Sequence, residues 1–557
     1  MTEDMKIGCP EAVATGGGNF SDRLQKRHIR FLLLAFAGLL TGIAVAFPRF
    51  GIVEWVTLVP AGIFLLTCAS DPAFRLRRLY GYGLFFFMCY YVVVYHWFVN
   101  LYPLEFIDGM TKGAALAVVL VAWFGLSLLQ ALGGGLVFVL AGVLFRTRLC
   151  RRYGLLKPFV AAALWAVFEW SQTLGWWGVP WGRLPIGQTW LPAGIQTASW
   201  FGSYFITFLL VAVNFLLARI VLDRKCLRTC AVLAAALLVF QYGAGTALWI
   251  REGKREGKEV RVAAIQGNIA SGEKWSSEST SRTLEVYRLY TEKAAQDGAE
   301  IVVWPETALP YTLIPENSMW NYVSSLAKTN NVTILVGAFT PSDEAGEYNS
   351  ILCFLPDGSA LDTVYSKRRL VPFGEFVPMR GLISTLIPPL AELVMVDDDV
   401  AQGEGGQVFV LPQGNLGSLI CFDSIYEELT RESVLEGAEL ICLSTNDSWF
   451  TDSAALYMHN AQAQLRAVES GRYVVRAANT GVSTMISSRG EVQELLEPLV
   501  DGYLCTDVKI QSHMTLYDYI GNSFVWLCIG FAVLLMGHDI GVCLTERRRK
   551  GREKSET

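Results

Sequence analysis

The sequence predicts a multi-domain protein, in which an eight-helix transmembrane bundle is joined to a separate globular α/β domain. Three observations support this prediction. The 557 residues exceed the length of one ordinary domain. Residues 30–250 are mostly apolar, whereas residues 251–510 carry the mixture of charges found in soluble domains. The apolar runs are also long enough to cross a bilayer, which needs roughly 20 residues per helix.

Seven apolar runs precede the globular region and one follows it. They cover residues 30–48, 52–69, 79–99, 113–145, 157–173, 195–222, 228–249 and 521–543. The fourth run suits either one tilted helix or a helix broken at Gly133-Gly134-Gly135. We therefore expect a polar tail over residues 1–29, seven helices over 30–250, a globular domain over 255–510, a last helix over 521–543 and a basic tail over 544–557.

Basic residues are concentrated in alternate loops. These loops hold Arg75, Arg77 and Arg78; then Arg146, Arg148, Arg151, Arg152 and Lys157; then Arg219, Arg224, Lys225 and Arg228; and finally Arg547, Arg548, Arg549 and Lys550. The opposite loops hold little more than Arg49, Lys112 and Arg183. By the positive-inside rule both termini are cytoplasmic. The globular domain then lies outside the cytoplasm, which in a bacterium with two membranes means a multi-pass inner membrane protein with a periplasmic domain.

This orientation limits the chemistry that the domain can perform. Neither cytoplasmic ATP nor acyl-CoA reaches that side of the membrane, so a transferase there needs a donor that is already in the bilayer. One outward segment, residues 175–182, is rich in Trp, Gly and Pro. Two interpretations stay open for it: an interfacial aromatic belt, or a re-entrant loop that shapes a lipid-facing cavity.

Composition argues against two other classes of partner. The net charge is −5 and no basic stripe with interleaved aromatic residues is present, which argues against a nucleic-acid partner. The twelve cysteines form no CxxC pair and no metal-ligand spacing with histidine. We therefore expect no metal and no cofactor.

The globular region alternates short apolar strands with amphipathic helices. We predict strands at residues 260–265, 301–304, 333–336, 351–354, 363–365, 416–420, 439–443 and 473–476, and helices near 278–297, 318–329, 425–436 and 453–470. This alternation is typical of a layered α/β domain. The strands are almost continuously apolar, which indicates burial on both faces.

Reactive side chains follow three of these strands. Glu306 follows residues 301–304, Lys367 follows 363–365 and Cys421 follows 416–420. A cysteine attacks as the thiolate, a carboxylate can remove its proton, and an ammonium can stabilise the oxyanion of a tetrahedral intermediate. Taken singly, Cys421 suits a buried small residue, Lys367 a lipid-contacting basic patch and Glu306 a helix-start carboxylate. Together they form an acyl-transfer set.

The sequence blocks around these residues carry a resemblance to a known family. The blocks are Ile265-Gln266-Gly267-Asn268-Ile269 with Trp275; Val303-Trp304-Pro305-Glu306-Thr307-Ala308; Tyr365-Ser366-Lys367-Arg368-Arg369-Leu370-Val371-Pro372-Phe373-Gly374-Glu375; Ile420-Cys421-Phe422-Asp423-Ser424; Asn446-Asp447-Ser448-Trp449-Phe450; and Arg466-Ala467 through Arg476, Asn479 and Gly481. They resemble the nitrilase superfamily and, within it, the membrane-embedded apolipoprotein N-acyltransferases. The resemblance covers nearly all of the chain beyond residue 29.

The resemblance implies an αββα sandwich with a Glu–Lys–Cys triad. It assigns the triad to Glu306, Lys367 and Cys421. Supporting roles around the lysine, the intermediate and the oxyanion fall on Glu375, Phe422 and Asp423, and roles in substrate binding or a lid fall on Trp275, Phe373 and Trp449. Two residues depart from the commoner Tyr-Glu after the nucleophile, since Phe422 lacks the hydroxyl and Asp423 is one methylene shorter. His459 is expected to be structural, because this mechanism needs no imidazole.

The implied reaction has two steps. The cysteine takes an acyl chain from a phospholipid, typically phosphatidylethanolamine, and the resulting thioester is attacked by the amino terminus of a diacylglyceryl-cysteine apolipoprotein. A membrane-anchored nitrilase-type amidase, which uses water instead of the amine, is the alternative enzyme. A transporter or lipid-binding module with a degenerate domain is the non-enzymatic alternative. Charged residues inside the membrane usually mark a transport path, but the apolar runs contain few ionisable residues, of which His96 and Glu169 are the main ones.

Overall fold

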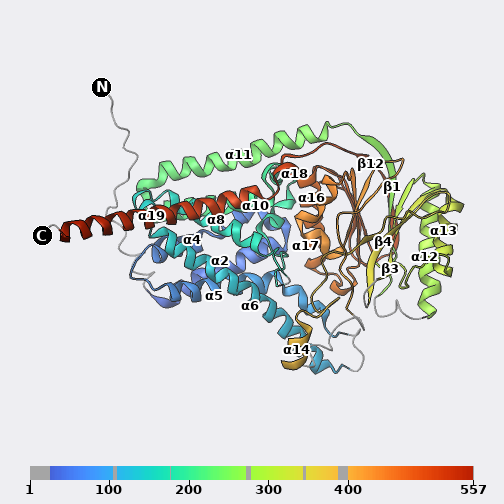
Figure 1. Ribbon diagram of the computed structural model, residues 1–557, viewed down its shortest axis with the longest axis horizontal. Helices are drawn as coiled ribbons and strands as arrows, with labels where there is room; N and C mark the ends of the chain where they lie inside the picture. Colours follow the sequence, from blue (N-terminus) through green and yellow to red (C-terminus); the bar gives the residue numbers. More distant parts are fainter. Residues whose placement is uncertain are drawn as a thin grey trace.

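The computed structural model describes residues 26–104, 110–175, 177–270, 277–342, 346–386 and 399–555. A helical bundle forms one end of the molecule and a two-sheet domain the other (Figure 1). The polar tail predicted over residues 1–29 lies outside the described residues except for its last four. Trp275 also lies outside them.

Each of the eight predicted apolar runs forms helical structure in the bundle. The main helices are α2 (Arg27–Ala46), α4 (Val59–Phe64), α5 (Leu76–Val94), α6 (Lys112–Phe145), α8 (Leu156–Ser171), α10 (Ser203–Leu222), α11 (Leu227–Gly253) and α19 (Ser523–Ser555). The second run is irregular: η1 (Pro48–Val53), α3 (Glu54–Thr57), α4 and the π-helical turn η2 (Leu65–Ala69) follow one another.

The glycines of the fourth run do not break its helix. α6 is continuous through Gly133, Gly134 and Gly135. A Cβ atom on Gly134 would lie 2.3 Å from the ring of Phe87 in α5. The bare backbone therefore lets an aromatic side chain of α5 pack directly on α6, as small residues do at other interfaces between membrane helices.

The predicted number of spanning helices was wrong by two. Among the described residues, six helical segments are long and apolar enough to cross a membrane: Arg27–Ala46, Pro48–Ala69, Lys112–Phe145, Ser203–Leu222, Arg224–Gly253 and Ser523–Ser555. α5 falls short because it includes Arg77, Arg78 and several tyrosines. α8 has 16 residues, a rise of about 24 Å, against a hydrocarbon core of about 30 Å. Both nevertheless lie inside the bundle, packed against α6.

The globular domain contains two six-stranded sheets. The first has the order β12-β1-β2-β3-β4-β5 and the second β11-β10-β9-β8-β7-β6. Their strands are β1 (Lys258–Gln266), β2 (Ile301–Val303), β3 (Thr333–Pro341), β4 (Glu347–Phe354), β5 (Tyr365–Ser366), β6 (Val408–Phe409), β7 (Leu416–Ile420), β8 (Leu440–Thr445), β9 (Val474–Ala478), β10 (Ser483–Ile486), β11 (Val492–Leu496) and β12 (Gly502–Ile510). β1, β2 and β3 run parallel, as do β7, β8 and β9.

Helices cover the outer face of each sheet, so the predicted αββα sandwich is confirmed. Apolar side chains from both sheets, among them Val262, Leu335 and Cys442, form the core between the sheets. α12 (Ser277–Gln296) and α13 (Ser318–Asn330) lie on the side away from the bundle, whereas α16 (Glu427–Leu435) and α17 (Ala454–Ser470) lie toward it (Figure 1). The burial of the central strands on both faces explains their continuous apolar sequence.

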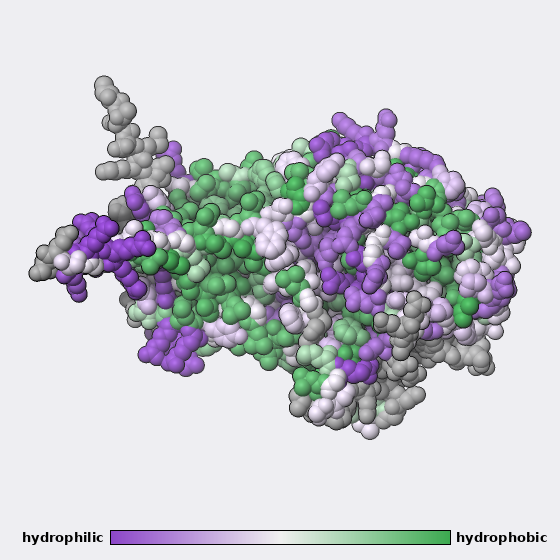
Figure 2. Space-filling view, in the orientation of Figure 1, coloured by the Kyte–Doolittle hydropathy of each residue, from purple (hydrophilic) through white to green (hydrophobic). Residues whose placement is uncertain are grey.

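The α16–α17 layer shares one apolar core with the bundle. Ile425, Met458 and Leu465 of the domain belong to the same buried cluster as Phe86 and Trp165 of the bundle. The surface changes character across this junction, since hydrophobic residues cover the bundle and hydrophilic residues dominate the domain (Figure 2). The side of the sandwich that carries β7 is therefore packed against the bundle.

Candidate active site

Strand ends position the three predicted catalytic side chains. Glu306 lies three residues beyond the end of β2, Lys367 directly follows β5, and Cys421 directly follows β7. β2 and β5 belong to the first sheet and β7 to the second. The site therefore lies where loops of the two sheets meet.

Lys367 binds two carboxylates. Its Nζ lies 2.8 Å from Oε1 of Glu306 and 2.8 Å from Oε1 of Glu375. Lys367 is 1% exposed and Glu306 is 5% exposed. Burial lowers the pKa of Lys367, but the charges of Glu306 and Glu375 outweigh burial and hold its pKa well above the ordinary value. The lysine therefore stays an ammonium, as an oxyanion-stabilising group requires.

Further donors fix both carboxylates. The side-chain amide of Asn349 donates to Oε1 of Glu306 at 2.8 Å and to Oε1 of Glu375 at 3.3 Å. Backbone N–H groups of Asn446 and Val371 donate to the remaining oxygens of Glu306 and Glu375, each at 2.8 Å. Asn349 was not among the residues predicted from the sequence. No local signal marks this residue, because Glu347, Tyr348 and Ser350 of the same strand also carry polar groups, but its burial at 3% exposure makes hydrogen-bond partners necessary.

A glycine permits the close approach that places Glu306. A Cβ atom on Gly337 of β3 would lie 2.2 Å from the carbonyl oxygen of Pro305 and 2.9 Å from Cα of Glu306. No residue with a side chain fits there without moving the backbone. The packing of β3 on this segment thus depends on glycine.

Cys421 begins the 3₁₀ turn η7 (Cys421–Ile425) and has a φ of 46°, in the left-handed region. Such a conformation is costly for a non-glycine residue and persists where the surrounding structure holds it. Burial raises the pKa of the Cys421 thiol, the charge of Glu306 raises it further, and Lys367 lowers it. The resting nucleophile is therefore a thiol that needs a base.

A second cluster includes the nucleophile itself, with Asp447 and His459 buried and Cys421 half-buried. The ligand-type atoms of Cys421, Asp447 and His459 lie within 4.8 Å of one another. Asp447 is already engaged, because Arg476 donates to it at 2.5 Å and His459 Nδ1 lies 3.0 Å away. A buried guanidinium at this carboxylate disfavours a second cation, so the donor set does not suit a metal. His459 Nε2 lies 3.1 Å from the Cys421 carbonyl oxygen, where it holds the turn.

Asp423 anchors the lysine loop through its backbone. Its carboxylate accepts from the backbone N–H groups of Arg368 at 3.2 Å and Arg369 at 2.7 Å, and from the Tyr365 hydroxyl at 2.8 Å. Burial raises the pKa of Asp423 to about 6, against the lowering effect of Lys367. The shorter carboxylate therefore reaches the backbone of the loop that carries Lys367, and it also accepts from the Ile420 backbone N–H at 3.2 Å.

The remaining predicted residues lie around this centre. Phe422 is buried, with its ring 5.5 Å from that of Tyr426. Phe373 is half-buried and has a φ of 62° in the loop between Lys367 and Glu375. Trp449 is half-buried in the turn η8 (Ser448–Phe450). The supporting role of Phe422 and the substrate-binding or lid roles of Phe373 and Trp449 stay predictions.

Comparison with known proteins matches both parts of the chain. Residues 37–216 match the apolipoprotein N-acyltransferase N-terminal domain, and residues 261–526 match the carbon-nitrogen hydrolase family. An apolipoprotein N-acyltransferase of Gloeobacter violaceus is 33% identical and covers 92% of this chain and 95% of its own length. This chain belongs to the apolipoprotein N-acyltransferase family.

Other relatives agree with this assignment to the apolipoprotein N-acyltransferases. One from Geobacter metallireducens is 29% identical over 92% of this chain and 95% of its own, and one from Methylococcus capsulatus is 30% identical over 94% and 97%. Among solved structures, an amidase from Nesterenkonia sp. aligns with 46% of this chain and 93% of its own at 17% identity, with a TM-score of 0.35. As a member of the apolipoprotein N-acyltransferases, the chain is an enzyme, an acyltransferase, and a membrane protein.

Proposed function

We propose that this enzyme transfers a fatty acyl chain from a membrane phospholipid, through a thioester on Cys421, to the amino terminus of a diacylglyceryl-cysteine apolipoprotein. The observation that carries the proposal is the buried Glu306–Lys367–Glu375 cluster, in which the charges of Glu306 and Lys367 act on the Cys421 thiol, in a domain that shares one core with an apolar helical bundle. A carboxylate, an ammonium and a thiol are sufficient for acyl transfer.

In the first half-reaction Glu306 acts as general base. It takes the proton from the Cys421 thiol as the sulfur attacks the ester carbonyl of the phospholipid, and Lys367 stabilises the negative oxygen of the tetrahedral intermediate. When the C–O bond breaks, the lysophospholipid leaves as an alcohol that takes the proton back from Glu306. The acyl group remains on sulfur as a thioester.

In the second half-reaction the amine of the apolipoprotein attacks the thioester. Glu306 accepts the amine proton, Lys367 again faces the oxyanion, and the sulfur leaves as a thiolate that is reprotonated. The products are an amide at the amino terminus and the free Cys421 thiol. Glu375 keeps Lys367 in place in both steps, and Asp423 fixes the backbone that carries it.

The same proposal includes an orientation in the bacterial inner membrane. Both termini are cytoplasmic and the sandwich is periplasmic, because the basic loops cluster on one side. The end of α19 that carries Arg547, Arg548 and Arg549 lies at the end of the molecule away from the sheets, which supports this arrangement (Figure 1). Phosphatidylethanolamine is the donor we expect.

The match of residues 37–216 to the acyltransferase N-terminal domain favours acyl transfer over the amidase alternative. The test is label transfer in proteoliposomes that contain acyl-labelled phosphatidylethanolamine. We expect label on the peptide that contains Cys421, and its loss to the amino terminus of an added diacylglyceryl-cysteine peptide. Absence of label together with release of ammonia from small amides would replace the proposal with an amidase.

A further inference from the structure

Arg183 is a fully buried cation between the bundle and the globular domain. It is 0% exposed and lies in the outward segment between α8 and α10. Its Nη1 donates to Oε2 of Glu427 at 2.8 Å, and its Nη2 donates to the Ile425 carbonyl at 3.1 Å and to Oε1 of Gln462 at 3.2 Å. These three partners belong to the globular domain, and Ile425 is the last residue of the turn that Cys421 begins.

The charges around Arg183 balance. Arg183 and Arg466 face Glu427 and Glu469, with Arg466 2.7 Å from Glu469 and 3.9 Å from Glu427. All four residues are at most 2% exposed. Burial raises the pKa of Glu427, but the two guanidiniums outweigh it and leave its pKa below the ordinary value. Two buried cations therefore neutralise two buried carboxylates, as burial of charge requires.

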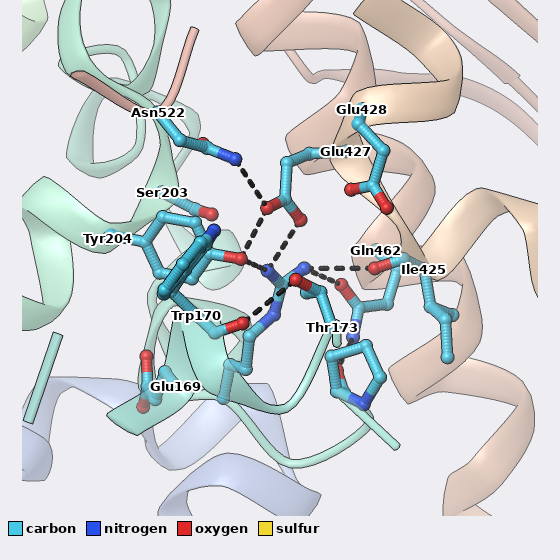
Figure 3. A network of polar contacts seen from close by, with 12 residues as sticks. Glu169, Trp170, Thr173, Ser203, Tyr204, Ile425, Glu427, Glu428, Gln462 and Asn522 are labelled. Carbon is cyan, nitrogen blue, oxygen red and sulfur yellow. Dashed lines mark hydrogen bonds and ion pairs between the residues drawn. The ribbon is translucent and has the colours of Figure 1, made fainter. Parts of the chain in front are cut away.

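Residues from the bundle complete the network. The Tyr204 hydroxyl donates to Oε1 of Glu427, and the Asn522 amide approaches the same oxygen at 3.5 Å. Figure 3 shows Tyr204 and Asn522 reaching Glu427 from one side, with Gln462 and Ile425 on the other. Arg183 is itself held on the bundle, because the adjacent N–H of Leu184 donates to Glu169 at 2.9 Å.

The segment from Gly178 to Arg183 contacts both α17 and the residues at the end of the nucleophile turn. The Tyr426 hydroxyl donates to the Gly178 carbonyl at 3.3 Å, and Gln462 donates to the Pro180 carbonyl at 3.1 Å. The ring of Trp181 lies 5.4 Å from that of His459. His459 in turn contacts the Cys421 carbonyl oxygen through its Nε2. This aromatic segment is thus bound to the sandwich, and neither interpretation of it from sequence included that contact.

We propose that Arg183 is a positioning residue for acyl transfer: by binding the Ile425 carbonyl and the Glu427 carboxylate, it fixes the turn that carries Cys421 to the membrane bundle. The inference rests on the proposed function. The thiol must meet an ester held in the bilayer, and the bundle fixes the position of the protein relative to the bilayer. A bond from the bundle to the nucleophile turn sets that distance, and a misplacement of 1 Å can slow a reaction by about 10²-fold.

The test compares Arg183→Met with the double variant Arg183→Met/Glu427→Gln. The single variant leaves Glu427 with one cation fewer, so loss of stability alone accounts for part of any defect. The double variant removes one charge of each sign and restores the balance, but it still lacks the donor to the Ile425 carbonyl. The matched control is Arg146→Met, which removes a guanidinium that binds the carbonyls of Ala69 and Phe74 at the end of α6.

Two rates on Cys421 are measured for each protein in proteoliposomes, together with the melting temperature. In the double variant we expect a melting temperature closer to wild type than that of Arg183→Met, and thioester formation from phospholipid that is slower by roughly tenfold to hundredfold. Alkylation of Cys421 by iodoacetamide should keep the wild-type rate and pH profile, because Glu306 and Lys367 are unchanged. Arg146→Met should keep both rates.

Two results would overturn the positioning role: wild-type thioester formation in the double variant, or an equal fall in alkylation and acylation. Failure of the proposed function looks different. In that case wild-type protein takes no acyl chain from phospholipid, although its Cys421 still reacts with iodoacetamide.

Discussion

At the scale of single residues, the site separates the tasks of base, cation and nucleophile. Lys367 lies between two carboxylates, so its charge persists after one carboxylate takes a proton. Burial raises the pKa of the Cys421 thiol, so attack depends on removal of its proton. Glu306 is the carboxylate whose charge acts on both the Lys367 ammonium and the Cys421 thiol, which makes it the candidate base.

The base role predicts the behaviour of Glu306→Gln. The amide keeps the shape and leaves Lys367 paired with Glu375, but it cannot accept the thiol proton at neutral pH. Thioester formation should slow by roughly 10²–10⁴-fold, measured as label on Cys421 against time. Glu300→Gln, an exposed change on the same domain, should have no effect. Near-normal labelling in Glu306→Gln would reject the base role.

Asp447 predicts how stability depends on pH. Burial raises its pKa, but Arg476 and His459 outweigh burial and lower the pKa to about 2. A depressed carboxylate pKa stabilises the fold above its ordinary value near 3.8, and this contribution is lost as pH falls toward 2. It amounts to about 2 kcal/mol.

The check is thermal unfolding in detergent of wild type and Asp447→Asn. The wild-type advantage should be largest at neutral pH, begin to shrink near pH 4 and be mostly gone near pH 2. Asp507→Asn, which breaks an exposed pair with Arg261, should change stability little at any pH. An advantage of Asp447 that is constant over this range would contradict the assignment.

At the scale of elements, the pattern of apolar residues correctly located those strands and helices that are determined by their own local sequence. The strands before Glu306, Lys367 and Cys421 and the helices α12, α13, α16 and α17 lie where apolar patterning places them. β6, β10, β11 and β12 were missed. β12 pairs with β1 more than 200 residues away, and β11 alternates exposed and half-buried residues, so neither has the continuous apolar signal of a central strand.

The site was also predictable only in part, because some of its residues act through contacts that are distant in the sequence. Glu306, Lys367 and Cys421 follow strands and carry reactive groups, so chemistry and position coincide. Asn349 and Arg183 act through partners distant in sequence, and nothing local distinguishes them. Eight spans were predicted, against six helices that are long and apolar enough among the described residues, because the runs that form α5 and α8 are apolar although α5 includes two arginines and several tyrosines and α8 has 16 residues.

The β2–β3 pairing predicts the effect of Gly337→Ala. The added Cβ would meet the Pro305 carbonyl and the Glu306 backbone, none of which can rotate away. We expect a loss of about 1–3 kcal/mol in stability and slower thioester formation, because Glu306 is displaced from Lys367. Gly243→Ala in α11, where a Cβ would meet nothing within 4 Å, is the control and should leave both unchanged. Full activity in Gly337→Ala would show that the contact does not place Glu306.

At the scale of the whole molecule, the bundle and the sandwich form one packed body. The α16–α17 layer belongs to both, and the Arg183–Glu427 pair crosses between them. A soluble hydrolase needs no such junction, since its substrate arrives from water. Here the nucleophile turn lies at the junction, on the side of the sandwich that faces the apolar part of the molecule.

The most direct test of this account is mass spectrometry of the intact enzyme as purified from membranes, followed by analysis of its peptides. We predict a long-chain acyl mass on the peptide that contains Cys421, sensitive to hydroxylamine as a thioester is, and none on those that contain Cys353 or Cys442, which are buried between the sheets. An unmodified Cys421 that takes up no acyl chain from added phospholipid would contradict the account.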